Sequence, residues 1–277
     1  MRGSCPECGL AVRATILSRV DPHADAFKPL PTPRLTANAV MLWPLGGLIA
    51  ALAAWVPRIA DLVAEIVGAP RPAGLARLGW VSVGGLGLSA LASIGLIGPT
   101  RETPLRLSLR AALGAACYIP LIWCWWRITL VIDPVSPAPY VDADPDPRRL
   151  AHRLCLGACA VVILILLRPN ARALVARSLV LRTGRVDRQT IYATAAAVAL
   201  AATGDLVRLA SVGLPPRSAV MVADAGSLLV LVASMLVTIG LAGATIDGWR
   251  LRRTLLTPPF RLAELLGPRS TKSGPAP

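Results

Sequence analysis

The chain has few charged residues for its length. They make up 16% of the 277 residues, whereas an ordinary soluble domain carries about 25%. Hydrophobic residues make up 55% of the chain, and its mean hydropathy is +0.61. This shortage of charge, together with several apolar runs of roughly 20 residues, excludes an ordinary soluble domain. It predicts an all-α fold, a polytopic membrane bundle.

The sequence also lacks the motifs of intramembrane enzymes. It contains no HExxH or GxSxG motif and no pair of intramembrane aspartates. Its two histidines, His23 and His152, fall on opposite sides of the predicted membrane. Because no nucleophile is placed beside a base, we expect the protein not to be an enzyme.

The basic residues are almost all arginine, since only Lys28 and Lys272 are lysine. A net charge of +14 would suggest nucleic-acid binding in a soluble protein. Here the arginines cluster between and beyond the apolar runs, where they orient the chain and contact anionic lipid headgroups. We therefore expect the lipid bilayer, and no nucleic acid, as a partner.

Six apolar runs predict six transmembrane helices. They cover approximately residues 39–56, 78–98, 107–131, 150–167, 190–209 and 225–246. Between the first two, Pro57 begins an amphipathic segment that ends at Gly68, and we expect a short helix in the membrane interface. Pro120, in the middle of the third run, should kink its helix.

The predicted spans divide the chain into five parts. These are residues 1–36 with a cysteine motif and a Pro-rich linker, helices 1–3 in 37–132, a Pro/Asp-rich loop in 133–149, helices 4–6 in 150–249 with a basic loop at 168–189, and a basic tail in 250–277. With both termini in the cytoplasm, the cytoplasmic segments hold 20 lysines and arginines and the opposite segments hold nine. This bias predicts that orientation in a bacterial cytoplasmic (inner) membrane.

The N-terminus lacks an apolar signal peptide and carries the motif Cys5-Pro6-Glu7-Cys8-Gly9 instead. Two thiolates at this spacing can hold one zinc ion, and in a reducing cytoplasm such a pair favours a metal site over a disulfide. On this CPxCG motif the chain resembles uncharacterised bacterial multi-pass membrane proteins that carry a zinc ribbon before their first span. The resemblance covers about residues 3–20. It implies that Cys5 and Cys8 bind Zn²⁺ and that the ribbon is a structural or docking module.

Half of such a ribbon is missing. A complete one needs a second CxxC about 15 to 20 residues away, and the nearest soft ligand before the first span is His23. Three explanations are open: a true start codon upstream of Met1 that adds the first half, two chains that pool their motifs around one zinc, or a metal-free remnant.

Few ionisable residues lie at membrane depth. Asp205, Arg208 and Asp224 fall at the extracytoplasmic ends of the fifth and sixth spans, where they could form one ion-paired cluster. Such residues are candidates for a substrate site, and the alternative is ion pairing at the interface. The seven tryptophans are expected to be interface anchors: Trp43, Trp55, Trp80, Trp123, Trp125, Trp126 and Trp249.

Two sets of residues, each on one face of a predicted helix, are interpreted as packing surfaces. Gly85, Ser89 and Ser93 form a stripe of small residues that lets a neighbouring helix of the same chain approach. His152, Cys155 and Cys159 share a face of the fourth span, where soft ligands could bind a metal or haem. The favoured interpretation is that the thiols pack as small apolar groups.

Two functions are consistent with these features. The first is a non-enzymatic scaffold whose zinc motif and basic tail recruit a cytoplasmic protein or a second copy of the chain. The alternative is a small-molecule transporter or channel subunit. Three spans, a long loop and three more spans would place the two halves in inverted orientation, as in many transporters.

Overall fold

The computed structural model describes residues 30–68, 74–100, 103–135, 146–177 and 190–257. Throughout these ranges the secondary structure is helical, without a β-strand, and six helices are long and apolar enough to cross a membrane. The predicted all-α bundle is confirmed, and the chain is a multi-pass membrane protein. The CPxCG motif, most of the Pro/Asp-rich loop, the second part of the basic loop and the end of the tail lie outside the described residues.

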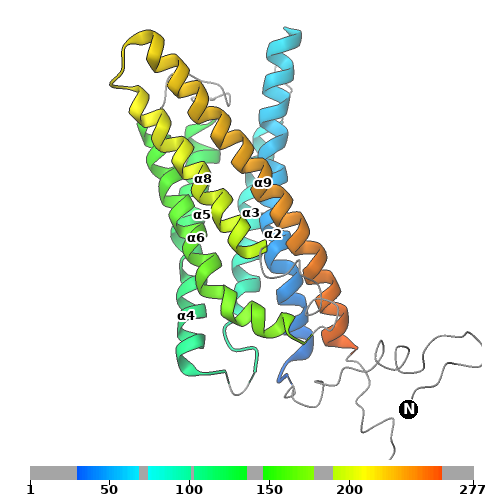
Figure 1. The fold of residues 1–277 in the computed structure, drawn as a ribbon. Coiled ribbons are helices and arrows are strands. Elements are labelled where there is room, and N and C mark those ends of the chain that lie inside the picture. The colour runs from blue at the N-terminus through cyan, green and yellow to red at the C-terminus, as the bar shows by residue number, and fades with distance from the viewer. Residues whose placement is uncertain (1–29, 69–73, 101–102, 136–145, 178–189, 258–277) are drawn as a thin grey trace, which may run out of the picture.

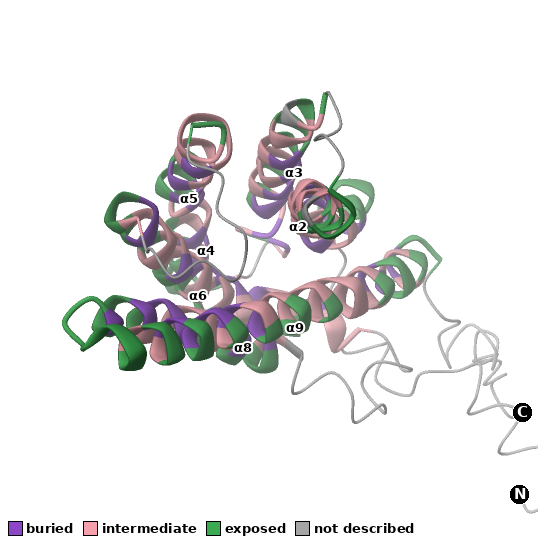
Figure 2. Cartoon of the chain, turned by 90° about the horizontal axis from the view of Figure 1, so that it is seen from above, coloured by how far each residue is buried: buried purple, intermediate pink, exposed green. Residues whose placement is uncertain are grey.

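Successive spans run up and down the bundle (Figure 1). The helices are α2 (Pro33–Val67), α3 (Ala76–Ile94), α4 (Leu105–Ala116), α5 (Tyr118–Trp126), the π-helix η2 (Arg127–Ile132), α6 (Pro147–Val175), α8 (Thr190–Ser211) and α9 (Pro216–Leu256). Together α4, α5 and η2 make one span. Seen along the bundle, the spans form a ring, because each contacts the next along the chain and α9 contacts α2 (Figure 2). We call the two ends of the bundle the Pro33 end and the Asp133 end.

The first span is longer than predicted. Helix α2 runs without a break from Pro33 to Val67 and ends at Gly68, whose φ is +67°. The separate interface helix beginning at Pro57 was therefore a wrong prediction. Transmembrane helices tolerate proline where side chains satisfy the disturbed backbone groups. Here Arg58 Nη1 donates to the carbonyl of Ala54 at 2.9 Å, in the turn that leads to Pro57.

The kink predicted at Pro120 is confirmed. Helix α4 ends at Ala116 and α5 begins at Tyr118, so the helix breaks just before the proline. Proline has no N–H to donate to the carbonyl four residues earlier, and its ring clashes with that group. The third span is consequently assembled from three helical pieces.

Helices α6 and α9 continue through charged residues beyond the apolar runs predicted for them. Helix α6 begins at Pro147, because the Asp146 carboxylate accepts a hydrogen bond from the backbone N–H of Arg148 at 2.8 Å. It continues to Val175, so residues 168–175 of the predicted basic loop are helical. Helix α9, with 41 residues, also extends past both ends of its predicted span.

Glycines set the closest helix crossings. A Cβ atom added to Gly46 of α2 would lie 2.5 Å from the carbonyl oxygen of Gly85 of α3. A Cβ added to Gly204 of α8 would lie 2.7 Å from the carbonyl oxygen of Gly226 of α9. Any larger residue would force the backbones apart at these points. The stripe of small residues on α3 therefore packs within the chain, as interpreted from the sequence.

Candidate functional site

Two adjoining cavities occupy the centre of the ring. One, of about 220 Å³, lies toward the Asp133 end, and the other, of about 240 Å³, lies toward the Pro33 end. Both are lined by Ala51, Trp125, Leu156, Val198 and Val237, so they meet at that level. The ring of helices thus holds two neighbouring cavities of different chemistry.

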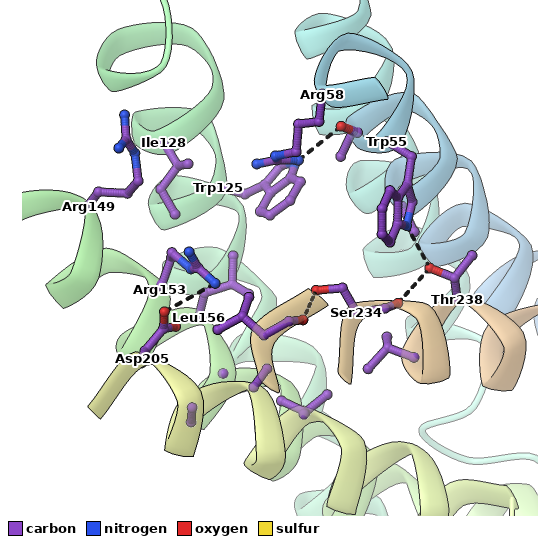
Figure 3. Close-up of a pocket in the computed structure, with 18 of the residues that line it drawn as sticks. Trp55, Arg58, Trp125, Ile128, Arg149, Arg153, Leu156, Asp205, Ser234 and Thr238 are labelled. Atoms are coloured by element: carbon purple, nitrogen blue, oxygen red, sulfur yellow. Dashed lines mark hydrogen bonds and ion pairs between the residues drawn. The ribbon is translucent and has the colours of Figure 1, made fainter. Parts of the chain in front are cut away.

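The first part, which we call the polar cavity, is lined by charged side chains from three spans and from the end of η2 (Figure 3). They are Arg58 on α2, Asp133 after η2, Arg149 and Arg153 on α6, and Asp205 and Arg208 on α8. Figure 3 labels Arg58, Arg149, Arg153 and Asp205. Four guanidinium groups thus meet two carboxylates among the lining residues.

The deepest ion pair of the polar cavity joins α6 to α8. Arg153 Nη2 lies 3.1 Å from Asp205 Oδ1, and the pair is visible in Figure 3. Asp205 is only 3% exposed and Arg208, one turn further along α8, is 7% exposed. These are charges inside an apolar bundle, where a carboxylate is stabilised by the guanidinium groups around it.

A second group of charges lies at the Asp133 end. Asp133 Oδ1 is 3.2 Å from Arg149 Nε, and Asp133 Oδ2 is 3.7 Å from Arg58 Nη2. Burial raises the pKa of the Asp133 carboxyl, while the positive charges of Arg58 and Arg149 act in the opposite direction. Asp133 thereby connects α2 to α6 across the mouth of the ring.

The second part, which we call the apolar cavity, has few polar groups. Its walls include Trp43, Leu86, Leu121, Ile163, Leu164 and Leu241. At the junction of the two cavities, the Trp125 indole N–H donates to Ser82 Oγ at 2.7 Å. The Ser82 hydroxyl in turn donates to the carbonyl of Ala50 at 2.8 Å, which joins α5, α3 and α2.

Three polar residues of the apolar cavity, Trp43, Ser89 and Tyr118, satisfy one another. The Trp43 indole N–H donates to the Tyr118 hydroxyl at 2.8 Å. The Tyr118 and Ser89 hydroxyls are 2.8 Å apart, and Ser89 Oγ donates to the carbonyl of Trp43 at 2.7 Å. If Tyr118 donates to Ser89, each hydroxyl gives one hydrogen bond and receives one, and the circuit closes. Such a circuit lets hydroxyls lie in an apolar interior without a water or ligand partner.

Three of the predicted interface tryptophans face the interior of the ring, and their role as interface anchors stays a prediction. Trp43 and Trp125 line the cavities and bond as described above. Trp55 also lines the polar cavity, and its indole N–H donates to Thr238 Oγ1 of α9 at 3.0 Å (Figure 3). The indole N–H needs an acceptor when it is buried, and hydroxyls on neighbouring helices provide one.

The other tryptophans lie farther out. Trp80, Trp123 and Trp249 are 63%, 54% and 43% exposed, and Trp126 is half-buried. Their positions agree with the predicted role as anchors, which stays a prediction. Trp123 also packs against the ring of His152, with centroids 5.3 Å apart.

The structure changes the membership of the predicted charged cluster. Asp205 and Arg208 line the polar cavity, but Asp224 is exposed on α9 and does not line it. Arg153, on another span and not part of the predicted cluster, forms an ion pair with Asp205. In the sequence, Arg149 and Arg153 looked like topology signals. Their spacing of four residues at the start of a helix was the signal that they share a face.

The predicted zinc ligands Cys5 and Cys8 lie outside the described residues. Among the described residues, no group of three or more His, Cys, Asp and Glu side chains is arranged to hold a metal ion. His152 Nδ1 instead lies 2.7 Å from the backbone carbonyl of Arg148, and Cys155 is exposed on the same helix.

Guanidinium groups are the strongest protein ligands for carboxylates and phosphates, which they bind through two parallel hydrogen bonds. The polar cavity therefore has the chemistry of an anion site, walled on one side by apolar residues. Comparisons of the chain with protein-family models, with curated proteins and with solved structures found no match.

Proposed function

We propose that the protein is a membrane transporter that binds an anion in the polar cavity. One observation carries the proposal: four arginines and two aspartates line a cavity inside a ring of apolar spans. Charges inside a membrane bundle are expensive and are typical of substrate pathways. Guanidinium groups bind carboxylates and phosphates through paired hydrogen bonds, so four of them among the lining residues favour an anionic substrate.

This proposal fits the cavity better than a purely scaffolding role. A scaffold that docks partners through its cytoplasmic segments needs no charged cavity between its helices. The CPxCG motif remains a proposed zinc-binding docking module attached to the transporter.

Exchange of ion-pair partners provides a mechanism. A carboxylate or phosphate that enters the cavity would compete with Asp205 for Arg153, whose side chain is 24% exposed. Binding would thereby loosen the connection between α6 and α8, and release would restore it. Two arrangements of one ion pair are the kind of bistable element that alternating access requires. In the proposed orientation, with both termini cytoplasmic, this cavity lies toward the extracytoplasmic side.

The test is uptake by the purified full-length protein in phosphatidylcholine liposomes. Labelled phosphate, succinate and dodecyl phosphate serve as anions, and labelled choline serves as the cationic control. We expect uptake of at least one anion above that of protein-free liposomes. Arg153→Gln should lower it about tenfold or more, since it removes a hydrogen bond to a charged group.

The matched control is Arg148→Gln, which removes an exposed arginine of the same helix that does not line the cavity. Its uptake should equal that of the wild type. Gel filtration of each variant shows that it is folded. Uptake that equals protein-free liposomes for all three anions, or that falls equally in both variants, contradicts the proposal.

A further inference from the structure

The shape and chemistry of the whole central space narrow the class of substrate, given the proposed function. The polar cavity borders the apolar cavity, because Trp125, Leu156 and Val198 line both. A molecule bound by the arginines at one end would therefore have its other end next to the apolar cavity. A small hydrophilic anion would use only the polar part of the space.

The apolar cavity offers little to a hydrophilic ligand. Trp43, Ser89 and Tyr118 use their polar groups on one another. Aliphatic side chains such as Leu86 and Ile163 form much of the remaining wall. Cavities with such walls stay dry and take up apolar molecules.

The depth of the space matches the length of one lipid chain. Arg153 and Ile163 line its two parts and lie on the same helix, α6. With a rise of 1.5 Å per residue, the distance along the helix is about 15 Å. The hydrocarbon core of a bilayer is about 30 Å thick, so one chain covers about half of it.

We infer that the substrate is a single-chain anionic amphiphile, which specifies the substrate of the proposed transporter. Its phosphate or carboxylate head binds among Arg58, Arg153 and Arg208 in the polar cavity. Its alkyl chain extends past Trp125 into the apolar cavity. The head is held by charge-assisted hydrogen bonds, and the chain is held by apolar contact.

Photolabelling of the full-length protein in phosphatidylcholine nanodiscs tests the placement of both ends. The probe is dodecyl phosphate with a diazirine at the end of its chain. After irradiation, we expect mass spectrometry to find the label on residues of the apolar cavity such as Ile163 and Leu241. An excess of dodecyl phosphate should remove this label, whereas an equal excess of dodecyltrimethylammonium should not.

Substitutions test the binding of the phosphate head and the binding of the alkyl chain separately. Arg153→Gln should lower the cavity label about tenfold or more, while Arg148→Gln should label like the wild type. Ala160→Phe places a ring in the apolar cavity, which Ala160 lines, and should shift competition from dodecyl phosphate toward hexyl phosphate. If Ala160→Phe does not fold, the position of the chain is tested by the wild type alone. Label on residues that line the apolar cavity supports the inference, and label elsewhere contradicts it.

Binding of labelled inorganic phosphate to the same nanodiscs distinguishes failure of this inference from failure of the proposed function. Arg153-dependent binding of phosphate without a label in the apolar cavity would overturn the amphiphile and leave an anion transporter. A label confined to lipid-facing residues, equal in Arg153→Gln, without phosphate binding would overturn both.

Discussion

The polar cavity and the apolar cavity lie in the same ring of helices, yet their polar groups are satisfied in different ways. Near the Asp133 end, charged side chains such as Arg153 and Asp205 form ion pairs between spans. Deeper in the bundle, neutral groups such as Trp43 and Tyr118 form hydrogen bonds that close on themselves. Charges are less expensive near the end of a span, where water and headgroups are close, and neutral circuits suit the centre. The contrast fits the proposed substrate, whose charged head binds near the end of the spans and whose alkyl chain lies deeper.

The largest effect is expected from removing the buried carboxylate of the polar cavity. Asp205→Ala takes away an ion-pair partner of Arg153 and a negative charge close to Arg208. Breaking one side of a buried pair costs about 3 kcal/mol or more. We expect the free energy of unfolding, measured by denaturation in mixed micelles, to fall by that amount.

The double variant Asp205→Ala with Arg153→Leu provides the control for this prediction. It should be more stable than the sum of the two single losses indicates, because neither charge is left behind. If the two losses of unfolding free energy simply add, Arg153 and Asp205 do not stabilise each other. Ion pairing would then not distinguish the polar cavity from the apolar cavity energetically.

An intermediate effect is expected at the helix crossing beside the apolar cavity. A Cβ on Gly85 would lie 2.7 Å from the carbonyl oxygen of Gly46, so Gly85→Ala must push α2 away from α3. Overpacking of this kind costs about 1 to 3 kcal/mol. Thermal unfolding should show a lower midpoint for Gly85→Ala.

The neighbouring residue gives a matched control, since a Cβ on Gly84 would meet no atom within 4 Å. Gly84→Ala should leave the midpoint unchanged or raise it slightly, because alanine favours helix over glycine. Equal effects of the two substitutions would show that the close crossing does not hold this wall together.

The smallest effect is expected from the neutral circuit. Tyr118→Phe removes the hydroxyl that accepts from Trp43 and contacts Ser89. Hydrogen bonds between membrane helices average about 0.6 kcal/mol, and a buried unpaired group can raise the loss to about 1 kcal/mol or more. Thermal unfolding should show a small decrease, with a change in tryptophan emission as the Trp43 N–H loses its acceptor.

Tyr192→Phe is the control, because Tyr192 is 53% exposed and its ring still stacks on Arg168, 3.9 Å away. It should change neither the midpoint nor the emission. If Tyr118→Phe behaves in the same way, the circuit contributes nothing measurable, and the apolar cavity is held by packing alone.

The sequence by itself determined the class of fold and the number of spans. A bilayer of fixed thickness demands apolar runs of a set length, and those runs are visible without a structure. Helix α8 was predicted to within two residues of its observed end at Ser211, and the break before Pro120 followed from the missing proline N–H. These features depend on local composition and backbone chemistry alone.

Helix ends were less well predicted, because charged residues can extend a helix beyond the membrane. Hydropathy ends an apolar run where charge begins, yet α9 continues through Arg250 to Leu256. Likewise Pro57 reads as the start of a new helix, whereas α2 passes through it.

Only the tertiary structure decided which side chains meet. Asp205 and Arg208 stood out in the sequence, but nothing local pairs Asp205 with Arg153 on another span. Trp43 and Trp55 lie at the ends of an apolar run, where interface anchors are expected, yet they point into the ring. The rotation of each helix about its own axis determines such contacts. In a membrane both lipid and protein interior are apolar, so that rotation is set by close packing and hydrogen bonds between helices.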